Sequence, residues 1–349
     1  MTSASIVHAA VFAVGAIVGG GIVTAIGSRN RQLPAPVPAA APVHAPPPVV
    51  DVKGGALTPI TSPGAVVTVD AALPVLKYGH PGPISDLLVR KAYVASYDRR
   101  LRHPAWTAEH LSLASLGKSV LDAPRNSNET GDRSQSTFTE DQSIPALFRS
   151  KLQDYFRSGY DRGHMVPAAD AKISQAAMDE TFLLTNIAPQ VGVGFNRHYW
   201  AYMEDWCRRL TSTFADVYVF TIPLYLPKLE SDGKWRVSHE VIGTPPNVSV
   251  PTHFAKVVLT SRPSSPSTPH IPEISTGAFV VPNAPIPDEA KLENFVVPVE
   301  AVERAAGLTL FSDAIKSSSK HICKTTKCEV IVRRFDDAQK RTKAIAAPR

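Results

Sequence analysis

The stretch Ser158-Gly159-Tyr160-Asp161-Arg162-Gly163-His164-Met165-Val166-Pro167 decides the fold that we expect for this chain. A short β-rich segment that ends in Gly-His indicates a strand that stops at the edge of a site, because glycine lets the backbone approach a ligand closely. His164 can take a proton from water, since an unperturbed imidazole titrates at about 6.5. Arg162 offers a planar fork of donors that matches phosphate oxygens. The pair points to phosphodiester chemistry, and the alternative is a hairpin turn with an exposed ion pair.

A second group of polar and aromatic residues follows some thirty residues later. It comprises three runs: Thr185-Asn186-Ile187-Ala188-Pro189-Gln190, Phe195-Asn196-Arg197-His198-Tyr199-Trp200 and Met203-Glu204-Asp205-Trp206. With these residues the sequence resembles the DNA/RNA non-specific nucleases, and most closely the mitochondrial endonuclease G branch with its fungal members. That family carries Asp-Arg-Gly-His, then Asn-x-x-Pro-Gln, and then an Asn eight residues before a Glu on one helix.

The resemblance extends over roughly residues 75–312. It takes in Ser96-Tyr97-Asp98 with Trp106, Phe138-Thr139-Glu140-Asp141, Pro251-Thr252-His253-Phe254, and Pro298-Val299-Glu300 through Arg304-Ala305-Ala306-Gly307. One departure is visible after the histidine, where family members usually have Gln-Ala-Pro or Leu-Ala-Ala and this chain has Met165-Val166-Pro167.

The resemblance implies a mixed α/β (α+β) fold with a ββα-metal nuclease core, in which helices flank a central antiparallel sheet. In such a core His164 is the general base and Arg162 binds phosphate. Asn196 is the direct metal ligand, and Glu204 orients metal-bound water. Magnesium fits a site with one amide oxygen, because it keeps several waters and few protein ligands; Mn²⁺ is expected to substitute.

Two further residues are expected near this site. Asn186 is a candidate to hold His164 or Asn196 in place. Arg133 precedes Arg162 by 29 residues, about the separation of a second phosphate-binding arginine in family members. The alternative for Arg133 is a solvated loop arginine.

The function implied is a Mg-dependent, sugar-non-specific endonuclease that cleaves single- and double-stranded DNA and RNA to 5′-phosphate ends. Two alternatives stay open: a catalytically weak, membrane-tethered nucleic-acid-binding protein, and a nucleotide phosphodiesterase. Binding alone needs none of His164, Asn196 and Glu204, which disfavours the first. Activity on a dinucleotide against a long duplex would discriminate the second. Homodimerisation is implied by the resemblance only.

The net charge of +6 is unevenly distributed. Residues 314–349 hold ten Lys/Arg and three Asp/Glu, a surplus of +7, and residues 1–50 hold two arginines and no acid. The remainder carries 6 − 7 − 2 = −3, so a nucleic-acid groove must be a local basic patch. The three cysteines make no disulfide framework: Cys207 fits a buried helix position, and Cys323 and Cys328 are close enough to pair.

The first 72 residues separate into an anchor and a tether. Residues 5–27 are small, apolar and uncharged, long enough to span a bilayer. We expect a membrane anchor with mitochondrial targeting in residues 1–30 and a Pro/Ala-rich linker in residues 31–72. The nuclease domain is expected at residues 73–313 and a basic tail at residues 314–349. Family resemblance places the domain outside the matrix, in the intermembrane space at the inner membrane, whereas Arg29 and Arg31 favour the opposite topology.

Hydrophobic patterns predict the principal elements of the domain. Strands are expected at 92–97, 182–186, 216–222, 254–259, 277–281 and 295–297. Helices are expected at 172–179, after Asn196 as an N-cap, and between Pro298 and Gly307, with a short helix or turn at 107–111. The Ser/Pro-rich residues 261–276 are expected to form a disordered surface loop.

Overall fold

The computed structural model describes residues 82–117, 130–268 and 270–332. The chain divides into two units, Met1–Gly82 and Pro83–Arg349, and the second is the one described here. Among the described residues, no helix has the length and apolar character to cross a bilayer. The anchor predicted at residues 5–27 and the linker at 31–72 lie outside the described residues.

A central sheet organises the second unit. Its strands run in the order β1-β2-β3-β6-β11-β12-β13, with every neighbouring pair antiparallel. The short β14 joins β12 in parallel, so the sheet is mixed rather than wholly antiparallel as expected. The strand bounds are β1 Ser85–Val89, β2 Tyr93–Asp98, β3 His103–Leu111, β6 Asp216–Leu224, β11 His253–Pro263, β12 Pro272–Pro282, β13 Val296–Val297 and β14 Lys320–His321.

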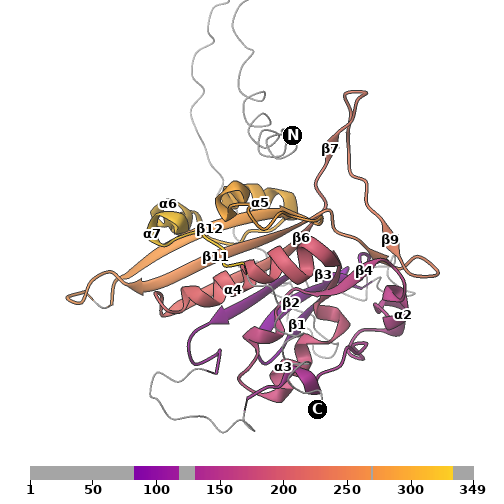
Figure 1. The fold of residues 1–349 in the computed structure, drawn as a ribbon, viewed down its shortest axis with the longest axis horizontal. Coiled ribbons are helices and arrows are strands. Elements are labelled where there is room, and N and C mark those ends of the chain that lie inside the picture. Colours follow the sequence, from indigo (N-terminus) through magenta and orange to yellow (C-terminus); the bar gives the residue numbers. More distant parts are fainter. Residues whose placement is uncertain (1–81, 118–129, 269, 333–349) are drawn as a thin grey trace, which may run out of the picture. The chain divides into compact units, whose positions relative to one another are not determined.

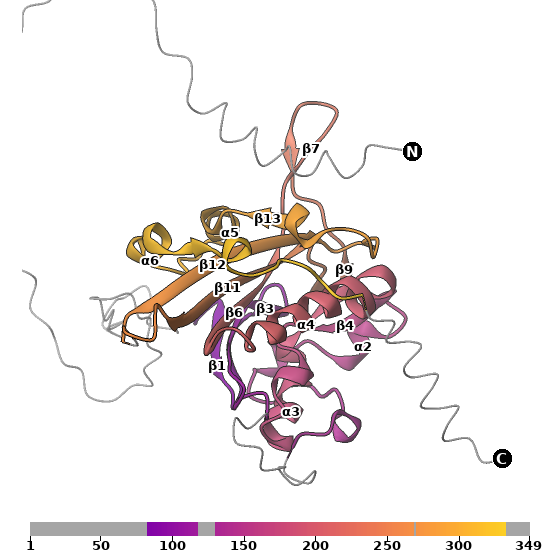
Figure 2. The ribbon, with the colours of Figure 1, turned by 60° about the vertical axis from the view of Figure 1, so that its left-hand side comes forward.

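Strand β11 is buried on both faces of the sheet, and the alternation of its side chains decides what each face contacts. Phe254 and Val258 of β11 pack in one cluster with helix α4 (Trp200–Leu210). Ala255 and Val257 pack in another cluster with α5 (Val299–Ala306). Figures 1 and 2 accordingly show α4 and α5 on opposite sides of the sheet.

A second small sheet stands beside the first. Strands β4 (Tyr160–His164) and β5 (Ile187–Val191) pair with each other in antiparallel register, with His164 opposite Ile187. Helix α3 (Gln175–Thr181) lies in the connection between them. Directly after β5 come the π-helical segment η6 (Gly192–Tyr199) and α4, so two strands and one helix follow in sequence.

Short helical turns and two-stranded pairs connect the longer elements. The 3-10 turns are η2 Arg133–Gln135, η3 Ala146–Phe148, η4 Ala168–Asp170, η5 Leu184–Asn186 and η7 Leu292–Phe295, and α2 spans Leu152–Tyr155. The two-stranded pairs are β7 Lys228–Leu229 with β8 Trp235–Arg236, and β9 Val241–Ile242 with β10 Val248–Ser249.

Residues 313–325 form three short elements on the sheet. Helix α6 (Asp313–Ser318), β14 and α7 (Ile322–Thr325) follow one another, and Ile322 is fully buried. Cys323 and Cys328 form a disulfide. On either side of Cys328, the carbonyls of Lys327 and Glu329 accept hydrogen bonds from Trp206 Nε1 and Arg209 Nη2 of α4, both at 2.9 Å.

Several expected elements need correction. Residues 107–111 belong to strand β3 rather than to a helix or turn, because their alternating side chains are buried at Thr107, Glu109 and Leu111. The strand expected at 182–186 lies at 187–191 instead, since residues 184–186 form a 3-10 turn. Much of the expected loop at 261–276 is strand, because β11 and β12 pair as far as Pro263 opposite Pro272.

Other expectations are confirmed within a few residues. Strands β2, β6, β11 and β12 and the short β13 lie where the hydrophobic pattern placed them. Helix α5 has Pro298 as its N-cap and ends at Gly307 with φ 69°, the left-handed conformation that glycine adopts without steric cost.

Candidate active site

His164 ends β4 inside an aromatic pocket. Its ring lies 5.3 Å from the ring of Phe138 and 4.8 Å from that of Phe182 between centroids, and the residue is 8% exposed. Burial, with the positive charge of Arg133 as a second cause, lowers the pKa of His164 to about 3. Its buried Nε2 has no hydrogen-bond partner among the described residues. The imidazole is therefore neutral at physiological pH and retains an unprotonated nitrogen.

The same two phenylalanines support the two arginines. The guanidinium of Arg162 lies 4.5 Å from the Phe138 ring centroid, and that of Arg133 lies 5.4 Å from the Phe182 ring centroid. Both arginines are exposed. Cation–π contact orients a guanidinium without occupying its hydrogen-bond donors. The structure thus brings Arg133 and Arg162 to the pocket of His164.

Asn196 is tied to β4 by a carboxylate. Its Nδ2 donates to Asp161 Oδ2 at 2.9 Å, and Arg197 binds both oxygens of Asp161 at 2.7 and 2.6 Å. Burial alone would raise the pKa of Asp161, but these hydrogen bonds hold it below its usual value. The N-cap assignment for Asn196 is wrong, because the residue lies inside η6 and its side chain bonds Asp161 instead.

Glu204 lies two turns along from Asn196, on α4. Burial raises the pKa of its carboxyl to about 7, while the charges of Lys256 and Arg208 oppose that rise. Arg133 also favours the ionised form, and the same arginine acts on His164. Glu204 and His164 therefore share the electrostatic field of one arginine.

Asn186 holds the chain on the C-terminal side of His164. Its Nδ2 donates to the carbonyls of Val166 and Thr181, both at 2.9 Å, and its Oδ1 accepts from the Val166 N–H at 3.0 Å. Its own carbonyl accepts from the Met165 N–H at 2.9 Å. Because Met165 and Val166 are fully buried, the unusual Met-Val-Pro run acts as a packed anchor directly after the histidine.

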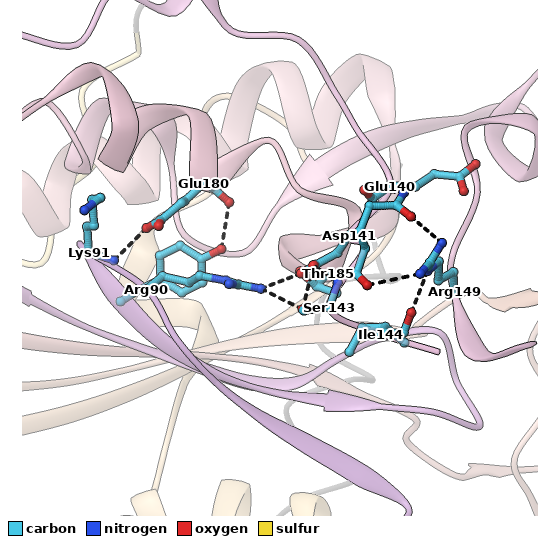
Figure 3. A network of polar contacts seen from close by, with 11 residues as sticks. Arg90, Lys91, Glu140, Asp141, Ser143, Ile144, Arg149, Glu180 and Thr185 are labelled. Carbon is cyan, nitrogen blue, oxygen red and sulfur yellow. Dashed lines mark hydrogen bonds and ion pairs between the residues drawn. The ribbon is translucent and has the colours of Figure 1, made fainter. Parts of the chain in front are cut away.

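A polar network braces the turn that carries Asn186. Asp141 accepts hydrogen bonds from Thr185 Oγ1 at 2.6 Å and from the backbone and side chain of Ser143, and it pairs with Arg90 from the β1–β2 turn. Figure 3 shows these contacts beside a second link, in which the Lys91 N–H donates to Glu180 Oε2 at 2.6 Å. The edge of the large sheet is thereby fixed to the residue that precedes Asn186.

The sequence does not predict the partners of these residues. Asp161 is expected from the sequence only to support the loop, and none of Phe138, Phe182, Arg197 and Lys256 is predicted to contact the site. The spacing of a motif carries no information on these contacts, since Asp161 and Asn196 are 35 residues apart. Only the proximity of Asp161 to His164 in the motif signalled its importance.

Comparisons with known proteins identify the family of this chain. A family model described as DNA/RNA non-specific endonuclease matches residues 72–317. The mitochondrial nuclease 1 of Schizosaccharomyces pombe is 49% identical over 264 residues, covering 76% of this chain and 78% of its own. The mitochondrial nuclease of Saccharomyces cerevisiae is 49% identical over 263 residues, with coverages of 75% and 76%.

A solved structure shares the fold as well. It is the crystal structure of an EndoG/EndoGI complex, described as showing the mechanism of EndoG inhibition. It aligns with this chain with a TM-score of 0.60 and 44% sequence identity. The match covers 70% of this chain and 93% of that one. The chain therefore belongs to the DNA/RNA non-specific endonuclease family and is an endonuclease of the branch that holds the fungal mitochondrial nucleases.

Proposed function

We propose that this metal-dependent endonuclease uses Mg²⁺, with Mn²⁺ as a substitute, and hydrolyses DNA and RNA to 5′-phosphate ends with His164 as general base. The observation that carries the proposal is the neutral imidazole of His164 between two arginines, on the strand that Asp161 connects to Asn196. A neutral base next to phosphate-binding groups is what attack by water on a phosphodiester requires.

The role of His164 follows from its surroundings. The imidazole is unprotonated in the free site and so needs no deprotonation before it accepts a proton, although a pKa of about 3 makes it a weaker base than an imidazole that titrates near neutral pH. The rings of Phe138 and Phe182 restrict its orientation, and Asn186 fixes the backbone that follows it. A positioned base of this kind typically contributes two to four powers of ten to a rate, on the order of 10²–10⁴.

The donor set fits a hydrated hard cation. Among the described residues there is no group of three or more His, Cys, Asp or Glu side chains that could hold a metal. An amide oxygen of Asn196 with the Glu204 carboxylate nearby suits Mg²⁺, which keeps several waters. When bound, the ion would supply charge stabilisation to the phosphoryl and departing oxygens. Asn196 would hold it, and Glu204 would orient water of its hydration shell.

The arginines bind the substrate backbone. Arg162 and Arg133 keep their donors toward solvent while their planes rest on phenylalanine rings. A phosphate held by this fork would lie beside His164, and its recognition would involve no base edge. This supports cleavage of both DNA and RNA without base preference.

Both fungal relatives are named as mitochondrial nucleases, which supports a mitochondrial location for this protein. An inner-membrane anchor in residues 5–27, a domain in the intermembrane space and a homodimer remain proposals. A fusion of residues 1–50 to a fluorescent protein should resist carbonate extraction from mitochondria, and recovery in the cytosol would contradict the anchor.

Nicking of supercoiled plasmid tests the chemistry. His164→Ala should lose most of the turnover yet still bind duplex, because Arg162 and Asn196 remain. Asn196→Ala should show a defect that shrinks as Mg²⁺ is raised, since it weakens the hold on the ion. Wild-type turnover in His164→Ala would refute the assignment.

A further inference from the structure

A buried ammonium lies beneath the helix that carries Glu204. Lys256 of β11 is 1% exposed, and in the alternation of that strand it shares a face with Phe254 and Val258, the residues that pack with α4. Apolar residues fill the same face on either side of it. Burial of a charged group is costly unless the group is paired and hydrogen-bonded, so a lysine buried here needs specific partners for its ammonium group.

Two contacts fix the ammonium. Lys256 Nζ donates to Thr221 Oγ1 of β6 at 2.9 Å, and it lies 4.6 Å from the ring centroid of Trp200 on α4. Trp200, Glu204 and Arg208 are spaced by four residues and lie on one stripe of that helix. The ammonium thus contacts the residue one helical turn before the proposed working carboxylate. Of the neighbouring charges, Lys256 most strongly favours ionised Glu204.

Three further titratable residues surround Glu204: Arg208, Asp170 and Glu109. Arg208 Nη1 pairs with the buried Asp170 of η4 at 2.7 Å. Glu109 of β3 is buried with its Oε2 unpaired among the described residues, and burial raises its pKa well above its usual value. Burial thus favours the protonated form of Glu109.

A half-buried and a buried cation act on Glu204. Arg208 is paired with Asp170 and its charge also favours ionised Glu204, while Lys256 is the neighbouring cation with the larger effect. Arg133 acts on Glu204 from the site side, and the buried thiol of Cys207 remains uncharged because burial raises its pKa.

We propose that Lys256 is a positioning residue for Glu204: its ammonium, fixed by Thr221 and the Trp200 ring, is the counter-charge that keeps the carboxylate in its working place on α4. The inference rests on the role proposed above for Glu204. Because Lys256 is buried behind the helix, it touches neither nucleic acid nor the reacting atoms. It should therefore affect turnover and leave substrate binding unchanged.

The first experiment removes the charge of the Lys256 side chain and keeps its approximate volume. Lys256→Met in the full chain should lower kcat for plasmid nicking by about ten- to a hundredfold, the usual cost of losing a supporting group. KM and duplex affinity without metal should stay unchanged, and Lys256→Arg should recover part of the lost kcat. The acid limb of the kcat profile should move to higher pH in Lys256→Met, because Glu204 loses the charge that favours its ionised form.

A double-mutant cycle tests whether Lys256 acts through Glu204. In a Glu204→Gln background the Lys256→Met substitution should cost no further kcat, because the carboxylate it supports is gone. Glu109→Gln mimics the protonated acid and should not reproduce the Lys256→Met defect. If it does, Lys256 serves Glu109, and the inference is wrong.

Other outcomes separate this inference from the proposed function. Wild-type kcat in folded Lys256→Met, with Glu204→Gln inactive, overturns the role of Lys256 alone. A fully active Glu204→Gln overturns the role of Glu204 and the inference with it. If Lys256→Met does not fold by thermal melting, Thr221→Val replaces it. This variant keeps the lysine and removes its hydrogen-bond acceptor, and it must lower kcat without raising KM, an effect absent in the Glu204→Gln background.

Discussion

The buried imidazole of His164 should make folding stability depend on pH in a measurable way. Its pKa is about 3 in the folded protein against an unfolded value of about 6.5. Between these values the unfolded chain binds a proton that the folded site refuses, so stability from this group is complete above pH 6.5 and decreases as pH falls. At pH 5 the loss is RT ln(1 + 10^1.5), about 2 kcal/mol.

The assay is a comparison of melting temperatures. His164→Leu keeps an apolar side chain in the pocket of Phe138 and Phe182 and cannot titrate. For a domain of this size, about 2 kcal/mol corresponds to roughly 4–8 °C in Tm. Between pH 7.5 and pH 5, the wild type should therefore lose that much more Tm than the variant. Exposed His270, replaced by leucine, controls for removal of an imidazole from the surface.

Two results would refute this reasoning. One is a Tm difference between wild type and His164→Leu that is the same at both pH values. The other is a titration of the His164 ring protons by NMR with a midpoint near 6.5, which would show that the imidazole reaches solvent or an unrecognised acid. Either result would also show that burial does not lower the pKa of His164.

Three further predictions concern the surroundings of the site. Asp161→Asn should raise the Mg²⁺ concentration needed for half-maximal nicking by about tenfold or more, because Asn196 loses its anchor; an unchanged Mg²⁺ titration would contradict this. Cys328→Ser should lower the free energy of unfolding by about 2 kcal/mol, the entropy of so short a closed loop, and reductant should lower the wild-type Tm but not that of the variant. Removal of residues 333–349, with six Lys/Arg and two Asp/Glu, should make the salt dependence of duplex binding shallower by about 0.9 for each phosphate that these residues neutralise, and an identical slope would show that they neutralise none.

The residues proposed for chemistry could be predicted from the sequence, but their contacts could not. Asp-Arg-Gly-His and the spacing of Asn196 and Glu204 are local patterns, and a motif records them directly. The bond between Asp161 and Asn196 depends on how β4 and β5 pair and on where η6 begins. Asparagine is suited both to cap the N-terminus of a helix and to donate a hydrogen bond to a carboxylate, so the residue type alone cannot distinguish the two roles.

The errors in secondary structure have a similar origin. Thr107 and Glu109 are polar residues in a segment expected to form a short helix or turn, and the buried cluster around Lys256 that accommodates Glu109 is made by distant strands. Ser/Pro-rich residues 261–276 favour a loop by composition, whereas pairing across the hairpin from Ser261 to Pro263 overrides that preference. Where strong apolar periodicity or clear caps were present, as in β6 and α5, local signals and tertiary packing agreed.

The small sheet of β4 and β5 affects how the sequence of this protein can change during evolution. Apart from Arg133, every residue proposed for catalysis lies between positions 162 and 204, on or directly beside two strands that pair with each other and the helix after them. An insertion at the tip of the β11–β12 hairpin or between β7 and β8 leaves every spacing within that segment intact. Selection can therefore reshape those outer loops for new partners or substrates while the reaction itself is inherited unchanged.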